Sequence, residues 1–190
     1  IRIIFPTAAV GFALQMEAGG LGLVNWLGAT GWPVLFASIV LLDLAIWAQH
    51  VVFHRVPMLW RLHRMHHTDN DLDVTSGARF HPLEILLSML IKLAVIGALG
   101  APAVAVMLFE VLLNASSMFN HANVALPGWL DRALRQLIVT PDMHRVHHSV
   151  VNEETNANFG FCLSVWDRLF GTYTAQPRAG HSGMTLGLPG

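Results

Sequence analysis

Charge is the scarcest property of this 190-residue chain. Charged residues make up 12 % of it and hydrophobic residues 54 %. A soluble domain usually carries about 25 % charged residues. The mean hydropathy of +0.51 excludes a disordered chain and argues against an ordinary soluble domain. The formal net charge of −1 leaves no basic surface for nucleic acid, so no nucleic-acid partner is expected.

Cysteine is almost missing as well. Cys162 stands alone, which excludes an internal disulfide and any zinc finger built on cysteine. Histidine, in contrast, is abundant, because the 11 His equal Lys and Arg taken together. Ten of them lie from His50 to His148. A membrane-like composition with clustered imidazoles is therefore the pattern that a structure has to explain.

Long apolar runs account for the hydropathy. Residues 1–14 are apolar enough to belong to a membrane helix, and residues 33–54 form the first strong run. Residues 83–97 and 103–119 are two further apolar limbs around a break at 97–102 that contains Gly and Pro. We predict that these limbs form a helical hairpin. The expected fold class is all-α, an integral membrane protein with transmembrane helices; a soluble bundle with a very apolar core and a re-entrant hairpin are the alternatives.

The hairpin predicts a topology. A hairpin returns the chain to the side it left, so the polar stretch 54–81 and the residues after 121 should share one face of the membrane. Most Lys and Arg lie in these two parts, and the positive-inside tendency makes that face cytoplasmic. We expect a cytoplasmic helical cap, in the bacterial inner membrane or, in a eukaryote, in the endoplasmic reticulum membrane. The expected segments are a trimmed N-terminal membrane segment (1–32), a main domain (33–174) and an irregular tail (175–190).

Histidine motifs follow the apolar runs. His50 and His54 form an HxxxH, and residues 63–67 and 144–148 each read HxxHH with Arg in the second place. Two copies of a three-histidine pattern greatly exceed what chance placement gives. On a helix, positions i, i+3 and i+4 share a face, so the rings of one motif point into one volume. The natural split sends i and i+4 to one metal ion and i+3 to a neighbouring ion.

The number of imidazoles suggests two metal ions. The three motifs supply eight rings, and His121 at the foot of the second limb makes nine, which is too many for one ion. The candidate metal ligands are His50, His54, His63, His66, His67, His121, His144, His147 and His148. His81, just before the hairpin, is a further candidate that could equally cap the next helix or bond Glu84. His181 in the Gly-rich tail is expected to be solvated.

The ligand chemistry favours a redox pair of ions. Imidazole binds Fe, Zn, Cu and Ni, but structural zinc sites are usually closed by four ligands and often include Cys. Neither HxxHH holds a carboxylate between its histidines, as a zinc hydrolase of the HExxH type would. A single non-haem iron typically uses two His and a carboxylate. A dimetal centre, above all of iron, fits best. Acidic groups should orient the rings, and we predict Asp43 and Asp142 in that role.

In order, these motifs resemble those of the fatty acid hydroxylase superfamily, which includes sterol desaturases, sphingolipid hydroxylases and alkylglycerol monooxygenase. Residues 43–67 look like its first two histidine boxes, and residues 79–84, 119–123 and 140–149 are similar to its later ones. Residues 158–173 resemble its closing block. The resemblance implies a di-iron site on the nine histidines above, leaves the role of His81 open, and suggests that Asn123 and Asn158 shape the site.

The resemblance also implies an activity. It indicates an O₂-dependent non-haem di-iron enzyme that hydroxylates or desaturates an unactivated C–H of a sterol, fatty acyl chain or related lipid taken from the bilayer. Two Fe are the implied cofactor, O₂ is the co-substrate, and no catalytic residue is expected beyond the metal ligands. The chain shows no nucleotide-binding glycine loop and no second redox module, so a separate ferredoxin or cytochrome b5-type protein with a reductase should supply electrons.

Two other classes of function compete with this hypothesis. One is a His-rich membrane metal-binding or metal-transport protein without redox catalysis, although the motifs lie outside the long apolar runs, which argues against transport. The other is a structural metal protein without activity.

Overall fold

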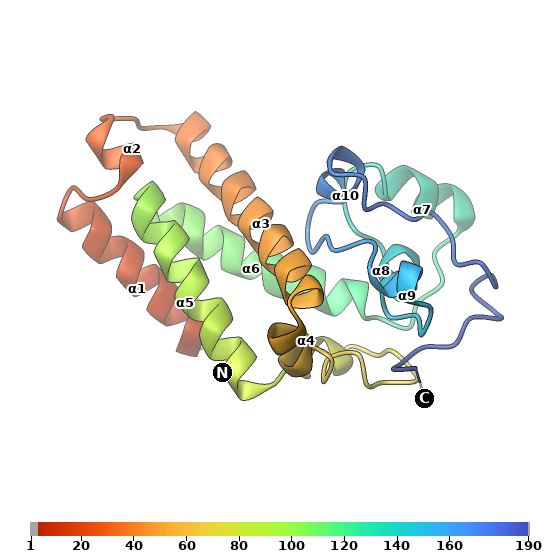
Figure 1. Cartoon of the computed structure of the whole chain (residues 1–190). Helices are drawn as coiled ribbons and strands as arrows, with labels where there is room; N and C mark the ends of the chain where they lie inside the picture. Colours follow the sequence, from red (N-terminus) through yellow and green to blue (C-terminus); the bar gives the residue numbers. More distant parts are fainter. Residues whose placement is uncertain (1–3, 190) are drawn as a thin grey trace. The chain divides into compact units, whose positions relative to one another are not determined.

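Helices make up the fold (Figure 1). The structure is a computed structural model that describes residues 4–189. Within this range it contains α-helices and one 3₁₀ turn, and no β-strand beyond two isolated bridges, Ile138 with Leu163 and Ser149 with Leu186. The predicted all-α class is therefore confirmed.

The helix bounds agree with the apolar runs. The first strong apolar run, residues 33–54, forms α3. The two limbs of the predicted hairpin are α5 and α6, and residues 100–102 join them. The elements are α1 (Ile4–Ala18), α2 (Leu23–Trp26), α3 (Trp32–Arg55), α4 (Pro57–His63), η1 (Ser76–Ala78), α5 (Pro82–Leu99), α6 (Ala103–Asn120), α7 (Gly128–Leu134), α8 (Pro141–His147), α9 (Asn152–Thr155) and α10 (Val165–Leu169).

Four segments are long and apolar enough to cross a membrane: Phe5–Trp26, Trp32–Arg55, Pro82–Leu99 and Ala103–Asn120. Their surfaces agree with that role, because large apolar side chains such as Phe36, Leu90 and Val111 are exposed. In water such a surface would be costly, whereas lipid solvates it without cost.

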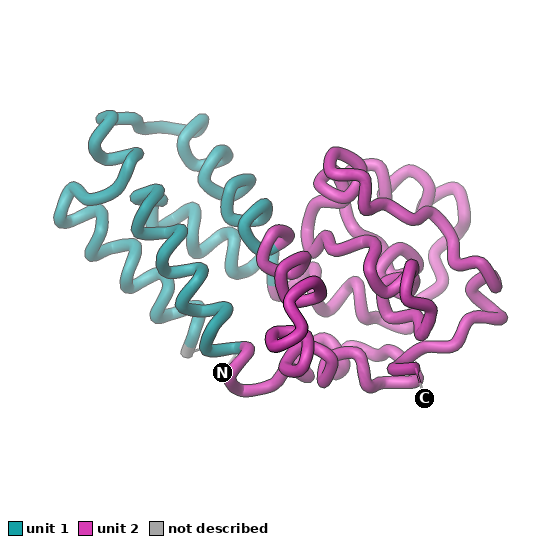
Figure 2. The backbone as a smooth tube through the Cα atoms, viewed as in Figure 1, with its two compact units in different colours: residues 1–46, 85–113 teal, residues 47–84, 114–190 magenta. Residues whose placement is uncertain are grey.

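The chain forms two compact units, coloured separately in Figure 2. Unit 1 contains residues 1–46 and 85–113, and unit 2 contains residues 47–84 and 114–190. The two long helices α3 and α6 each contribute residues to both units.

Unit 1 is a packed set of apolar helices. Ala9 and Ala13 on α1 are fully buried, and small residues at this spacing let helices approach closely. The Glu17 carboxylate accepts a hydrogen bond from the Ala103 backbone N–H (3.0 Å), which satisfies one of the free donors at the start of α6. Lys92 on α5 and Glu110 on α6 form a buried ion pair that joins the two limbs of the hairpin.

Unit 2 buries imidazoles where a usual domain buries hydrocarbon. Six of its largest fully buried side chains are histidines, beside Phe53, Phe159 and Met143. The C-terminal tail is ordered against this core: Val150 N–H donates to the Thr185 carbonyl (3.0 Å) and Gly187 N–H to the His148 carbonyl (3.1 Å). Because the buried groups are polar, they need partners, and those partners define the site.

Candidate metal centre

Nine histidines of unit 2 gather into two groups that could each hold a metal ion. In each group the candidate ligand nitrogens lie within 4.8 Å of one another. The five-histidine group contains His50, His54, His63, His67 and His147, and the four-histidine group contains His66, His121, His144 and His148. These are the nine histidines that the spacing singled out.

The first three ligand positions come from the end of α3 and from α4. His50 and His54 stand one turn apart on α3, so both rings face the same side, and both belong to the five-histidine group. The helix α4 ends at His63, where i to i−3 bonds replace the α-helical ladder: His66 N–H donates to the His63 carbonyl (2.8 Å). The first HxxHH is therefore a helix end with a tight turn and not a continuous helix.

The second HxxHH lies on α8 and its C-cap. His144 and His148 belong to the four-histidine group, whereas His147 belongs to the other. The first motif divides in the same way, with His63 and His67 in one group and His66 in the other. The i and i+4 rings thus share a group and the i+3 ring joins the neighbouring group, as the spacing predicts.

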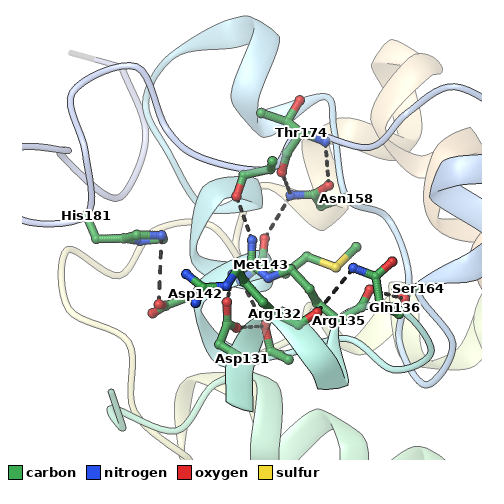
Figure 3. A network of polar contacts seen from close by, with 12 residues as sticks. Asp131, Arg132, Arg135, Gln136, Asp142, Met143, Asn158, Ser164, Thr174 and His181 are labelled. Carbon is green, nitrogen blue, oxygen red and sulfur yellow. Dashed lines mark hydrogen bonds and ion pairs between the residues drawn. The ribbon is translucent and has the colours of Figure 1, made fainter. Parts of the chain in front are cut away.

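Polar contacts hold α8 in place (Figure 3). The Thr140 hydroxyl accepts from Met143 N–H at the start of α8 and donates to Asp131 (2.6 Å). Asn158 donates from its amide to the Met143 carbonyl (2.9 Å) and to the Thr174 carbonyl (2.8 Å). Its backbone φ of 55° is in the left-handed region, which Asn tolerates well. Asn158 therefore ties the ligand helix α8 to the segment that follows α10.

The Nδ1 atoms of five rings have hydrogen-bond acceptors. His50 Nδ1 lies 2.8 Å from the Phe159 carbonyl, His121 Nδ1 2.7 Å from the Ser117 carbonyl and His147 Nδ1 2.8 Å from the Ala157 carbonyl. His66 Nδ1 lies 3.2 Å from the Arg79 carbonyl, and His63 Nδ1 lies 2.6 Å from Glu84 Oε1. A carbonyl can only accept, so the four rings that face one carry hydrogen on Nδ1, and each of these neutral rings then has a bare lone pair on Nε2.

Nε2 atoms face one another in both groups. His50 Nε2 lies 3.1 Å from His63 Nε2, and His66 Nε2 lies 3.1 Å from His121 Nε2. In the pair His66 and His121 both Nε2 atoms are acceptors, because both Nδ1 atoms face carbonyls, and a cation between them would relieve the repulsion. Metal–imidazole bonds of about 2.1 Å at right angles place two nitrogens about 3.0 Å apart. The ring positions therefore fit metal coordination.

Burial keeps the rings neutral. Loss of solvation lowers the pKa of His63, His66 and His67 well below its usual value, and neighbouring imidazoles lower it further. The same two causes lower the pKa of His144, His147 and His148. Neutral imidazole is the form that binds metal ions, so the site is in its metal-binding form at neutral pH.

Several of the other predicted site residues contact groups outside the nine histidines. His81 lies outside both groups, and its Nδ1 accepts from Leu83 N–H (3.2 Å) at the start of α5. Asn123 accepts from Arg145 (3.2 Å), and Asp142 lies 3.9 Å from His181, which is half-buried and not the solvated residue that was expected. Asp43 is buried on α3 in unit 1.

The orienting groups that the sequence did not single out are Glu84 and four backbone carbonyls. Glu84 is buried and contacts His63 directly. It lies in the first turn of α5, and other acidic residues also lie near the motifs, so only its distance from His63 in the fold distinguishes it. Gly77 leaves room for the His121 ring, since a Cβ at this position would lie 3.0 Å from His121 Nδ1.

Asp167 supports the segment behind His50. Its carboxylate accepts hydrogen bonds from the backbone N–H groups of Phe159 and Gly160 (2.8 Å each), Trp47 Nε1 (3.0 Å) and the Thr172 hydroxyl (2.7 Å). Burial raises the pKa of Asp167, and these hydrogen bonds oppose that shift. Through Phe159, whose carbonyl faces His50, Asp167 helps to set the orientation of that ring.

Helices fit to span a membrane and two histidine groups define the class: an integral membrane protein with histidine clusters that could hold metal ions. The fatty acid hydroxylase model matches residues 35–172, and the chain belongs to this family.

Several curated proteins are similar to the chain. An ornithine lipid hydroxylase, OlsE of Rhizobium tropici, is 31 % identical over 163 residues, covering 84 % of this chain and 47 % of its own length. Human alkylglycerol monooxygenase is 23 % identical over 74 % of the chain and 31 % of its own length. Cholesterol 25-hydroxylase of Rattus norvegicus is 23 % identical over 74 % of the chain and 47 % of its own length. The chain thus spans less than half the length of these relatives, and no solved structure matches it.

Proposed function

We propose that the protein is a membrane-bound di-iron lipid oxygenase. The five-histidine group would hold one iron and the four-histidine group the other. The observation that carries this proposal is the convergence of imidazole nitrogens in two groups, with Nε2 atoms 3.1 Å apart in each. When bound, two iron ions would supply the activation of O₂ that oxidation of an unactivated C–H requires.

The side chains of this chain do the positioning. Four Nδ1–H groups donate to carbonyls, which would fix those tautomers and aim Nε2 at the ion, and His63 Nδ1 contacts Glu84. Eight of the nine rings are buried, so bulk water is excluded from them and the neutral form that binds metal ions is favoured. The apolar helices would admit the substrate from the bilayer, and a separate ferredoxin or cytochrome b5-type protein with its reductase would deliver electrons.

The substrate class follows from the relatives. The names of the curated proteins refer to an ornithine lipid, an alkylglycerol and cholesterol, which are all apolar or amphiphilic molecules. We extend that class to this chain: a lipid with an aliphatic C–H to be hydroxylated, on the cytoplasmic side of the membrane. Desaturation uses the same centre and differs in the placement of the substrate.

Isotope labelling of the lipids tests the activity. Cells that express the chain, with a matched strain that expresses His147→Ala, are grown under heavy-isotope oxygen gas, and their lipids are compared by mass spectrometry. A lipid species that gains one heavy oxygen atom only with the unchanged histidine is expected. Identical lipid profiles in both strains, together with tight metal binding, would support the metal-binding alternative instead.

A further inference from the structure

A cavity of about 350 Å³ in unit 2 adjoins the five-histidine group. Four segments line it: the end of α3, α4 and its C-cap, the region of α9, and the C-terminal tail. The lining residues are His54, Trp60, Arg64, Ser149, Val150, Asn152, Thr155, Asn156, Gly187, Leu188 and Pro189. None of the proposed roles above uses this cavity.

His54 connects the cavity with the metal centre. Among the nine grouped histidines it alone is partly exposed, and it is the only one that lines the cavity. The Trp60 ring, which also lines the cavity, packs against both His54 (centroids 4.8 Å apart) and His67 (5.3 Å) of the five-histidine group. A molecule in the cavity would therefore lie next to the proposed metal site.

The cavity presents positive charge and hydrogen-bond donors. Arg64 is the only charged residue in its lining, and within residues 4–189 its guanidinium has neither an ion pair nor a hydrogen bond. The Ser149 hydroxyl already accepts from Val151 N–H (3.2 Å), which leaves its own O–H to donate.

The two acidic side chains of α9, whose neighbours line the cavity, are directed elsewhere. Glu154 accepts from Arg178 N–H (2.6 Å), and Glu153 lies 3.8 Å from the Arg178 guanidinium. Neither glutamate lines the cavity. A donor-rich cavity with one unpaired cation is complementary to an anion, and the planar guanidinium suits a carboxylate or a phosphate.

We propose that this cavity binds the anionic head group of the lipid, a carboxylate or a phosphate, with Arg64 as its counter-charge. The inference rests on the proposed function for the identity of the ligand as a substrate, but the binding itself does not require iron. Trp60, Val150 and Leu188 supply apolar walls for the first carbons of the chain. The oxidised carbon would then lie close to the head group and not at the far end of the tail.

Arg61 supplies a matched control for Arg64. It lies one turn earlier on α4, is exposed and carries the same charge, but it does not line the cavity. Arg64 is also exposed, so Arg64→Gln should fold normally, and Arg64→Lys keeps the charge without the planar fork.

Equilibrium binding to the metal-free full chain in uncharged detergent tests the proposal. The probes are radiolabelled dodecanoate, dodecyl phosphate, neutral dodecanol and inorganic phosphate. We expect at least one anionic amphiphile to bind about tenfold more tightly than dodecanol, a preference that Arg64→Gln removes, Arg64→Lys partly keeps and Arg61→Gln leaves intact. The preferred amphiphile identifies the head group.

Three outcomes would overturn the proposal: equal binding of dodecanol and both anions, an anion preference that survives Arg64→Gln, or inorganic phosphate binding as tightly as the amphiphiles. None of these depends on turnover. A protein that binds the anionic amphiphile but oxidises no lipid would refute the proposed function and leave the cavity assignment standing.

Discussion

At the scale of single residues, the two ring nitrogens of a grouped histidine such as His147 have different surroundings. In His147, Nδ1 lies 2.8 Å from the Ala157 carbonyl, while the buried Nε2 has no hydrogen-bond partner. A buried nitrogen without a partner costs free energy unless a metal ion fills its lone pair. A metal ion at Nε2 would remove this cost, which supports the ligand role proposed for His147.

His147→Ala tests this assignment against His81→Ala. The first variant removes a ring of the five-histidine group, and we expect loss of metal from that group and loss of lipid oxidation, with the protein still in the membrane. His81 lies outside both groups, so its variant should keep metal and activity. Metal content by elemental mass spectrometry measures both, and full metal loading of His147→Ala would refute the ligand role.

Glu84→Gln tests the orienting carboxylate. Glutamine keeps the shape but replaces the carboxyl group that lies 2.6 Å from His63 Nδ1 with an amide. Loss of such a partner typically costs about 10- to 100-fold in metal affinity. Competition with a chelator should show that decrease, with Asp142→Asn as the comparison. Unchanged affinity in Glu84→Gln would mean that the contact does not support the metal site.

The spacing of the motifs predicts which histidines share an ion, because i, i+3 and i+4 have fixed directions on one turn of helix. It cannot predict Glu84, since the contact joins His63 to a residue 21 positions later through the fold. The backbone carbonyls of Phe159 and Ala157 carry no sequence signal at all. The roles proposed for Asp43, Asp142 and Asn123 stay predictions.

At the scale of elements, the hairpin is the best-predicted part. The break at 97–102 separates α5 from α6 within two residues of the predicted limbs, because Gly and Pro end helices through the backbone itself. The turn at residues 63–67 is not predictable in this way. Its i to i−3 bonds form where the fold directs His63 and His66 into different histidine groups. The backbone of the tail is hydrogen-bonded to the loop before α9, a contact that the sequence does not predict.

The ion pair between the hairpin limbs predicts a stability effect. Lys92→Met leaves the buried Glu110 carboxylate without its cation, which should cost about 3–5 kcal/mol. The double variant Lys92→Met, Glu110→Leu removes both charges and should recover most of that loss. Thermal unfolding in detergent measures all three proteins, and a single variant as stable as the parent would show that the pair does not hold the hairpin.

At the scale of the whole molecule, the buried imidazoles make folding depend on pH. Burial lowers the pKa of six histidines, including His66 and His148, so the folded chain resists protonation, whereas the unfolded chain takes up protons below about pH 6.5. The unfolded state then binds more protons, and the free energy of unfolding must fall as pH falls.

The expected loss is up to about 1.4 kcal/mol per pH unit for each such histidine. Chemical unfolding of the metal-free protein between pH 8 and pH 5 should therefore show a steadily lower midpoint. Bound metal should shift the decline to lower pH, because protons must then displace the ion. A midpoint independent of pH would contradict the buried, neutral state of the rings.

The central claim is that the two histidine groups bind two iron ions. The most direct measurement is the metal content of the purified full chain, expressed with iron and zinc both present, combined with Mössbauer spectroscopy. The account predicts about two iron per chain in an imidazole-rich environment. One zinc per chain and no iron would contradict it.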